Sequence, residues 1–415
     1  MSAELKIAFR FLLARKRAML MSVAGIAFGV AFFILTQAQT RGFEDFYIRT
    51  ILGTTGAIQV HDRFQDTLRT MEAGGENGAA FRIAHREARQ YVEGVAEPGR
   101  VSAAIREFSN VTGVSEVVSG SARLRTPVRD QSIRLYGIRL EDHLMVSNLS
   151  EQLVRGNLQD FRQSSQGVLV GSTLARRMQL QVGDSFHLDT PAQSRRYRVA
   201  AIYETGVRDI DEARIYLHLG EARSLLKRPF GASFLQVELR DPDRAVRDAA
   251  RMEEVIGHFA YSWQERERAW LEVFRALRVS SGLTVATIIL IAGLGMFNTL
   301  AMIVMEKTRE IAILRSMGYR RKDILRIFLW QGAAVLTAGV GTGWLLGALF
   351  TFAVSRIPIR IRGIFATDYF VVSWSLSHYI WAVVIAAAVV LVAALIPARR
   401  AARLEPGDVI RRSAA

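Results

Sequence analysis

Several features that would quickly assign the chain to a class are missing from its sequence. None of the 415 residues is cysteine, which excludes a disulfide scaffold, a cysteine nucleophile and a cysteine-ligated metal. There is no Gly-Lys pair and therefore no phosphate-binding loop of the G-x-x-x-x-G-K-S/T type. The H-E-x-x-H and G-x-S-x-G motifs are absent, and the seven histidines show no metal-ligand spacing. We therefore expect no catalytic residue, no metal and no cofactor bound by this chain.

The balance of charge and hydrophobicity predicts a mixed protein. Charged residues make up 22%, too many for a chain embedded entirely in a bilayer, while a mean hydropathy of +0.16 is seldom seen in a soluble chain. A helix needs roughly 20 mostly apolar residues to cross a hydrocarbon core of ~30 Å. Four stretches without Asp, Glu, Lys or Arg meet that requirement, and the first has the pattern of an uncleaved signal anchor. They are residues 18–40, 279–305, 327–355 and 376–398.

Basic residues predict the orientation of these spans. Segments 1–17, 306–326 and 399–415, which four spans place on one side, carry 17 Lys/Arg and six Asp/Glu, or +11 of the total +15. Such an excess marks the cytoplasmic side and meets anionic membrane lipid. Residues 41–278 carry only about +2, so we expect no nucleic-acid partner.

Residues 41–278 alternate short strand-like and helical patterns, which is typical of an α+β domain. The predicted strands are 57–61, 116–124, 132–137, 167–170, 195–203, 213–217 and 233–239. The predicted helices are 82–91, 101–108, 172–178 with Ser172 as N-cap, 220–226, and 243–258 after Asp241-Pro242, and the Gly-rich stretch 71–80 is a predicted insertion. The predicted fold class is a membrane α-helical protein with four transmembrane helices and a large α+β extracytoplasmic domain between spans 1 and 2.

Two helical segments are expected to join this domain to the spans. After the first span, Phe43, Phe46, Tyr47 and Ile51 fall near one helical face. Before the second span, residues 263–278 read as one continuous helix. We therefore predict two rigid helical stalks.

The loop between spans 2 and 3 carries the most specific pattern, EKTREIAILRSMGYRRKDI, which begins at Glu306. Glu306 and Arg309 are spaced i, i+3 on a helix. Ile311 and Leu314 belong to an apolar stripe, and Gly318 is a natural helix stop. A short amphipathic helix of this kind lies on lipid headgroups or docks in a groove of a soluble partner.

This segment is similar to the coupling helix of the type VII ABC-transporter permeases, the group that contains MacB, FtsX and the lipoprotein-releasing permeases LolC and LolE. The stretch PARRAARLEP, from residue 397, also resembles that family's ending. Three longer stretches resemble the LolC/LolE branch, and the resemblance covers almost the whole chain. They are RGFEDFYIRTILG (41–53), GVLVGSTLARRMQLQVGDSFHL (167–188) and AMIVMEKTREIAILRSMGYRRKDILRIFLWQG (301–332).

The resemblance implies the permease subunit of an ABC transporter in the bacterial inner membrane, with both termini cytoplasmic. Such permeases pair as two homologous or identical subunits and bind cytoplasmic ATPase subunits, which hold the ATP and Mg. Closure of the ATPases moves the coupling helices, and the stalks carry the motion to the periplasmic domains. In the lipoprotein branch this mechanotransmission lifts a lipoprotein from the inner membrane and passes it to a periplasmic carrier bound for the outer membrane.

The resemblance assigns ATPase coupling to residues of the loop. Ile311 and Leu314 would fill a groove of the ATPase, and the charged residues would set complementarity. The predicted coupling residues are Glu306, Arg309, Glu310, Ile311, Leu314, Arg315 and Gly318. We expect Glu310→Arg to uncouple ATP hydrolysis from release.

Small and bulky residues in the spans suggest two further roles. Glycines at four-residue spacing allow close helix packing, and soft bulky side chains are candidates for acyl-chain contact, with ordinary helix packing as the alternative. The predicted packing residues are Gly25, Gly29, Gly339, Gly343 and Gly347. The candidate acyl-chain contacts are Phe28, Phe32, Met296 and Phe297.

One departure from the family leaves alternatives open. LolC members carry a long hairpin that grips the carrier, whereas the corresponding connection here, around residues 191–196, is short. The chain is then a LolE-like partner or a branch member with another substrate, and direct carrier recruitment stays open. The alternative functions are a MacB-like exporter permease for peptides or small amphiphiles, and an FtsX-like regulator of cell-wall hydrolases.

The predicted domain organisation combines these interpretations. It consists of a cytoplasmic segment 1–17, transmembrane helix 18–40, a periplasmic α+β domain with stalks 41–278, transmembrane helix 279–305, a cytoplasmic coupling-helix loop 306–326, transmembrane helix 327–355, a periplasmic loop 356–375, transmembrane helix 376–398 and a cytoplasmic tail 399–415.

Overall fold

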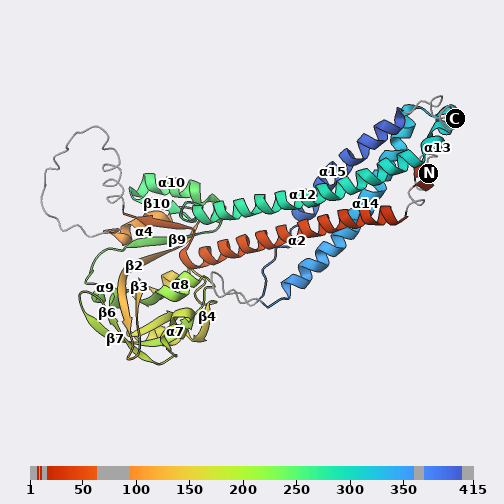
Figure 1. Ribbon diagram of the computed structural model, residues 1–415. Helices are drawn as coiled ribbons and strands as arrows, with labels where there is room; N and C mark the ends of the chain where they lie inside the picture. The colour runs from red at the N-terminus through yellow and green to blue at the C-terminus, as the bar shows by residue number, and fades with distance from the viewer. Residues whose placement is uncertain (1–6, 9, 12–15, 63–93, 359–368, 404–415) are drawn as a thin grey trace, which may run out of the picture. The chain divides into compact units, whose positions relative to one another are not determined.

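A computed structural model describes most of the chain, and its contacts divide the chain into two compact units (Figure 1). The described residues are 7–8, 10–11, 16–62, 94–358 and 369–403. The helical unit comprises residues 1–45, 272–359 and 369–415, and the sheet domain comprises 46–271 and 360–368. Both boundaries near the spans fall inside long helices, so α2 (Lys16–Thr55) and α12 (Arg268–Glu306) each contribute to both units.

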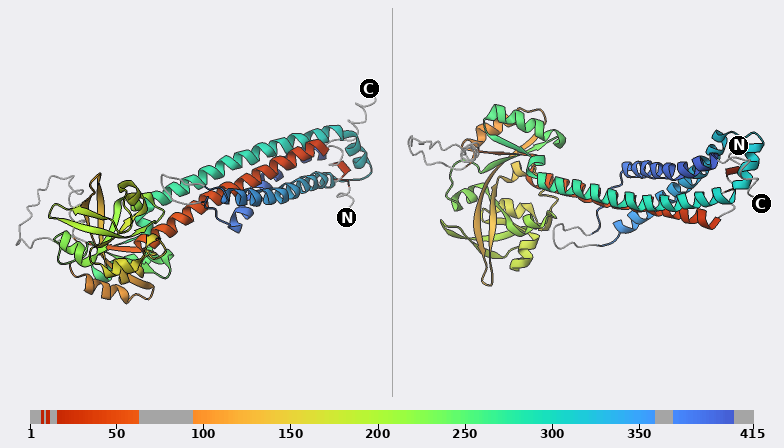
Figure 2. Two further views of the ribbon diagram at one scale, coloured as in Figure 1. Left: turned by 90° about the horizontal axis from the view of Figure 1, so that it is seen from below. Right: turned by 45° about the horizontal axis from the view of Figure 1, so that its top comes forward.

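The helical unit is built from long apolar helices that run alongside one another (Figure 2). Besides the unit's parts of α2 and α12 it contains α13 (Thr308–Ser316), α14 (Arg321–Ser355) and α15 (Leu376–Ala402). Helices α2, α12, α14 and α15 are long and apolar enough to cross a membrane, and the four predicted spans lie within them. At 40 residues α2 is about 60 Å long, roughly twice the thickness of a hydrocarbon core, so it extends well beyond a span.

The sheet domain contains one mixed sheet of ten strands in the described residues. Its strands are β1 (Ile58–His61), β2 (Val111–Arg125), β3 (Asp130–Ile138), β4 (Leu153–Gly156), β5 (Gly167–Gly171), β6 (Ser185–Asp189), β7 (Ser194–Tyr203), β8 (Arg214–His218), β9 (Phe234–Leu239) and β10 (Phe259–Ser262). Its shorter helices are α4 (Pro98–Arg106), α5 (Leu140–Leu144), α6 (Leu158–Gln163), α7 (Ser172–Met178), α8 (Arg208–Ala213), α9 (Leu219–Leu225), the 3-10 turn η1 (Pro242–Arg244), α10 (Ala245–Ile256) and α11 (Trp263–Arg266).

The strand order is β10-β1-β9-β2-β3-β8-β5-β7-β4, with β6 paired to β2 and β7. The β3–β8 and β5–β7 pairs are parallel and the other pairs are antiparallel. Two hydrophobic clusters support the sheet. One gathers apolar side chains of β2, β3 and β5–β8 with α7 and α9, and the other packs α4 and α10 against β1, β9 and β10.

Most predicted elements of this domain are confirmed, with a few exceptions. Strands β4, β6 and β10, of four or five residues each, were not predicted, whereas the equally short β1, β5 and β8 were. Gly171, not Ser172, is the N-cap of α7, and Ser172 is its first residue. The predicted helix 82–91 and the Gly-rich stretch 71–80 lie outside the described residues.

The predicted continuous helix 263–278 is interrupted once. A capping box at Ser262 and Glu265 starts α11, which ends at Arg266 with Glu267 as its C-cap, and α12 begins at Arg268. The interruption is slight, because Glu267 N donates to Trp263 O at 2.9 Å and Leu271 N donates to Glu267 O at 3.0 Å. Helical hydrogen bonding of the i to i−4 type therefore continues across the joint.

Candidate functional site

The loop helix α13 is delimited at its end by a glycine in a left-handed conformation. Met317 N donates to Ile313 O at 3.0 Å, and the next residue, Gly318, has φ of +99°. A side chain is disfavoured at that angle, so the chain turns there and leads into α14. The predicted helix stop at Gly318 is confirmed.

Helix α13 carries apolar side chains on two sides, one buried against the helical unit and the other exposed. Ile311 is 1% exposed and belongs to the hydrophobic core of the helical unit, and Leu314 packs against the same core. Ile313 and Met317, four residues apart, are 48% and 72% exposed. The apolar side chains that α13 presents outward are therefore Ile313 and Met317, whereas Ile311 and Leu314 anchor the helix to its own chain.

Some of the charged residues predicted for ATPase coupling are exposed, and others contact the rest of the helical unit. Glu306, Arg309 and Glu310 are exposed, and Lys307 forms an ion pair with Glu310. Arg309 and Glu310 form the polar part of the outward face of α13, and Glu306 lies just before it at the end of α12. The role predicted for them remains a prediction.

Arg315 and Lys307 instead contact other elements of the helical unit. The Nη1 of Arg315 donates to the carbonyl oxygen of Ala402 at 3.0 Å, which satisfies one of the free carbonyls at the end of α15. The ammonium of Lys307 lies 5.6 Å from the ring centroid of Phe11. With Ile311 in the core, α13 is fixed to the helix bundle at several points.

Three glycines of α14 pack against α2 at four-residue spacing. A Cβ added to Gly343 would lie 2.8 Å from Val30 Cβ and 2.9 Å from Ala27 O, closer than real Cβ contacts. The two helix backbones therefore approach so closely that only glycine fits. The contacting pairs are Gly339 with Ile26, Gly343 with Val30, and Gly347 with Ile34.

The glycines of α2 contact α12. A Cβ on Gly29 would lie 2.7 Å from Ile289 Cγ1, and one on Gly25 would lie 3.2 Å from Ala292 Cβ. Sequence reasoning missed Gly293, whose absent side chain makes room for Val389 of α15, because it has no small residue four positions away in a recognisable pair.

The candidate acyl-chain residues do not form one surface. Phe28 and Phe32 stack with ring centroids 6.1 Å apart, and Phe28 is 56% exposed. Met296 is 1% exposed in the core of the helical unit, and Phe297 is half-buried. Of the four candidates, only Phe28 is exposed, with Phe32 and Phe297 half-buried and Met296 buried.

In the helical unit, α2 and α12 are joined by polar contacts near residue 44. Glu44 forms an ion pair with Arg278, and Arg41 also approaches Glu44 at 3.9 Å. Gln37 Nε2 donates to Ser281 Oγ at 3.3 Å. These contacts tie the two helices together beyond their most apolar stretches.

In the sheet domain, the last turns of α2 are held against α11 and the start of α12. Tyr47 donates its hydroxyl proton to the carboxylate of Glu267, and burial is the main cause of a raised pKa for Tyr47. Arg266 Nη2 donates to Thr55 Oγ1 at 2.8 Å and to Gly56 O at 3.1 Å. The predicted stalks are thus cross-linked by side chains that helical periodicity alone did not single out.

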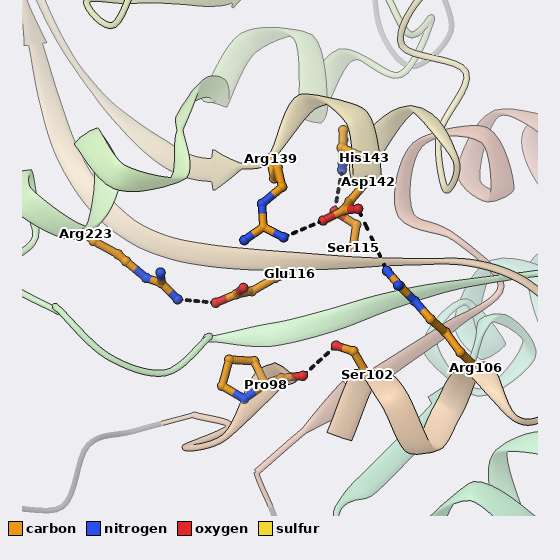
Figure 3. A network of polar contacts seen from close by, with 9 residues as sticks. All are labelled: Pro98, Ser102, Arg106, Ser115, Glu116, Arg139, Asp142, His143 and Arg223. Atoms are coloured by element: carbon orange, nitrogen blue, oxygen red, sulfur yellow. Dashed lines mark hydrogen bonds and ion pairs between the residues drawn. The ribbon is translucent and has the colours of Figure 1, made fainter. Parts of the chain in front are cut away.

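A polar network crosses β2 at the centre of the sheet domain (Figure 3). Arg223 pairs with Glu116, and Asp142 is approached by Arg139 at 2.9 Å and by Arg106 at 3.8 Å. Because these carboxylates are paired with arginines, we interpret the network as ion pairs that stabilise β2 and not as an acid–base pair.

His143 lies at the edge of the same network and is 1% exposed. Its Nδ1 is 3.4 Å from Ser115 Oγ. Burial, with the positive charge of Arg214 as a second cause, lowers the pKa of His143 to about 3. The imidazole is therefore neutral at physiological pH, and it packs as a buried side chain of the sheet domain.

Asp211 is a second buried titratable group in the sheet domain, and its carboxylate is held by three hydrogen bonds. It accepts hydrogen bonds from Thr205 N at 2.9 Å, Thr205 Oγ1 at 2.8 Å and Gly206 N at 3.2 Å. Burial outweighs these bonds and raises the pKa of Asp211 to about 6. With all three donors supplied by one turn, the carboxylate organises the segment before α8.

Family models match the chain in two segments. The MacB-like periplasmic core domain matches residues 19–255, and the FtsX-like permease C-terminal domain matches residues 282–406. The first model covers more than half of the chain.

Known proteins similar to the chain extend over nearly its full length. It is 22% identical to the lipoprotein-releasing system transmembrane protein LolC of Neisseria meningitidis, over 99% of each chain. It is 23% identical to LolE of Haemophilus influenzae, over 94% of this chain and 93% of that protein. Among solved structures, the periplasmic region of MacB from Actinobacillus actinomycetemcomitans matches 54% of this chain and 94% of its own, with 13% identity and a TM-score of 0.35.

Proposed function

The chain belongs to the MacB-like periplasmic core domain family and carries an FtsX-like permease domain, and on that premise we propose that it releases lipoproteins from the bacterial inner membrane as the permease subunit of an ABC transporter. The observation that carries the proposal is similarity over nearly the full length to proteins named as lipoprotein-releasing transmembrane subunits. A separate ATPase subunit supplies the energy, since this sequence has no phosphate-binding loop.

Helix α13 is the element we assign to the ATPase. Its outward apolar residues, Ile313 and Met317, are spaced i, i+4 and are flanked by the exposed charges of Arg309 and Glu310. An amphipathic helix that lays such a face into a groove is a recurring mode of protein recognition. The contacts of Ile311 and Arg315 with the bundle support the transfer of a push on α13 to α14 and α15.

Long uninterrupted helices support the outward transfer of that motion. Helix α2 continues from Lys16 to Thr55 without a break, and α12 continues from Arg268 to Glu306. Ion pairing of Glu44 with Arg278 joins α2 to α12 within the helical unit, and hydrogen bonding of Tyr47 with Glu267 joins α2 to the residue before α12 within the sheet domain. We propose that the two helices act as stiff levers, with both termini of the chain in the cytoplasm and the sheet domain in the periplasm.

An exposed polar residue in a predicted span supports a second permease subunit. Asn298 lies within span 2 and is exposed, and no hydrogen bond joins its side chain to another described residue. An amide is costly to leave facing lipid and gains from a partner across a helix–helix interface. We propose that a homologous or identical subunit covers this part of α12.

The direct test is ATP-dependent release from proteoliposomes. The chain is purified with its ATPase and partner subunit, reconstituted with a fluorescently labelled triacylated lipoprotein, and supplied with ATP and a periplasmic carrier. We expect labelled lipoprotein in the supernatant only when ATP, Mg and the carrier are all present. Export of a small amphiphile without any lipoprotein release would instead support a MacB-like exporter.

Substitutions in α13 test the coupling assignment. Glu310→Arg reverses a charge on the outward face and breaks the pair with Lys307, so we expect ATP hydrolysis without release. Ile313→Glu should strongly reduce copurification of the ATPase, because it puts a charge into an apolar contact. Val255→Glu, at a position of α10 that is 64% exposed, is the matched control and should leave copurification unchanged. Normal ATPase binding and release in both α13 variants would rule out this role for α13.

A further inference from the structure

Two arginines of the sheet domain lie directly opposite each other on neighbouring strands. Arg134 of β3 and Arg214 of β8 are partners in the parallel register, and the next pair on that face is Tyr136 with Tyr216. Like charges in directly opposed positions destabilise a sheet. A sheet that keeps such a pair needs a compensating group.

Aromatic side chains stabilise the guanidinium of Arg214, but no comparable contact stabilises that of Arg134. The guanidinium carbon of Arg214 lies 4.2 Å from the ring centroid of Tyr136, and its Nη1 donates to Tyr216 Oη at 3.2 Å. Arg134 is exposed and forms no ion pair or hydrogen bond with the described residues. Its charge therefore adds repulsion without a structural bond in return.

The acidic residues nearby do not neutralise the pair. Both arginines line a cavity of about 680 Å³ together with Arg208, Asp209 and Glu212. Glu212 is already engaged by Arg208 at 2.9 Å and by an ion pair with Arg177. Neither Arg134 nor Arg214 has a carboxylate within 4.0 Å among the residues that the structure describes.

The cavity has the size and the donor set of a ligand site. Its volume lies within the usual range for small-molecule pockets, roughly 300–1,000 Å³. Arg134 and Tyr136 also line a second cavity of about 540 Å³, which includes His61 and Arg228. A guanidinium offers five N–H donors in a planar fork, and two forks side by side match the several oxygens of a phosphate better than the two oxygens of one carboxylate.

We propose that Arg134 and Arg214 form an anion site on this face of the sheet and that it binds a phosphate group. The phosphate is that of a phospholipid headgroup or of a free phosphate compound, and either would sit between the two guanidinium groups. The site is separate from α13 and from lipoprotein release, so its test does not depend on the proposed function.

Calorimetric titration of the full-length protein in neutral detergent tests the site at constant ionic strength. The probes are inorganic phosphate, glycerol 3-phosphate and soluble dihexanoyl phosphatidylglycerol. Saturable binding of any probe by the wild-type protein is expected. Tighter binding of the dihexanoyl lipid than of the other two would identify a lipid headgroup, and the reverse order would identify a free phosphate compound.

Variants establish whether the arginine pair is the site. We expect Arg134→Gln to weaken binding about tenfold or more, since it removes charged hydrogen-bond donors. The affinity of Arg134→Lys should lie between those of the wild type and Arg134→Gln. Arg196→Gln, an exposed strand position of β7 outside both cavities, should bind like the wild type. Without phosphate, Arg134→Gln should melt at the same temperature as the wild type or higher, because like-charge repulsion is relieved. Absence of saturable binding in the wild type, or equal binding by Arg134→Gln, would overturn the proposal.

Discussion

The helical unit and the sheet domain use small and charged residues in opposite ways. In the helical unit, glycines bring helices into close contact, and the four apolar stretches 18–40, 279–305, 327–355 and 376–398 carry no Asp, Glu, Lys or Arg. In the sheet domain, charged and aromatic side chains enter the sheet itself, as with Arg214 over Tyr136 and Glu116 beside Arg223. We infer that close packing makes the helical unit stiff, whereas the polar side chains of the sheet domain are available to bind a ligand.

The largest effect is expected when a bulky side chain is placed between α14 and α2. Gly343→Leu would drive side-chain atoms into Val30 and the backbone of Ala27, and we expect it to cost roughly 3 kcal/mol or to prevent folding. Gly341→Leu is the matched control, since a Cβ there meets nothing within 4 Å. Thermal unfolding in detergent and the yield of monodisperse protein measure the difference. Equal behaviour of the two variants would refute close packing at Gly343.

Acid should affect the sheet domain through His143. The folded-state pKa of His143 is lowered to about 3 from 6.5, so between these values the unfolded chain binds more protons and the free energy of unfolding falls as pH falls. The loss approaches ~1.4 kcal/mol per pH unit within that window. The raised pKa of Asp211, about 6 against an ordinary 3.8, acts in the opposite direction, because between these values the folded state binds more protons than the unfolded chain.

Comparison with His143→Gln isolates the histidine contribution. The variant should lack this acid-dependent loss, so the difference in melting temperature between wild type and variant should shift in favour of the variant from pH 7 to pH 5. A difference that stays constant over that range would show that His143 does not titrate as its burial requires.

A smaller effect is expected where the sheet domain meets the start of the α11–α12 segment. Ser262→Ala removes the capping box with Glu265, and loss of an N-cap typically costs about 1 kcal/mol. Ser316→Ala, whose hydroxyl lies at the end of α13 and not at a helix start, is a suitable control. A cost at Ser262 no larger than at Ser316 would mean that the cap contributes little.

The spans and most strands were predictable because their signals are local. Apolar runs of more than 20 residues identified α2, α12, α14 and α15, and four-residue glycine spacing identified the faces that pack closely. The partner of each face was not predictable, because nothing in the sequence of α14 specifies α2 as its neighbour.

The orientation of α13 and the arginine pair depended on tertiary structure. Apolar residues occur on both sides of α13, so the pattern could not decide that Ile311 faces the bundle while Ile313 faces outward. Arg134 and Arg214 lie far apart in the sequence and meet only because β3 and β8 pair in parallel. Local periodicity carries no information about such a pairing.

Interrupting α2 and α12 should separate ATP hydrolysis from lipoprotein release. Four glycines are inserted after Asp45 in α2 and after Leu271 in α12, and ATP hydrolysis and lipoprotein release are measured in the same proteoliposomes. We predict that hydrolysis persists at a rate close to that of the wild type while release is lost. Release at the wild-type rate per ATP hydrolysed would show that motion reaches the sheet domain without stiff helices, and would rule out the lever mechanism.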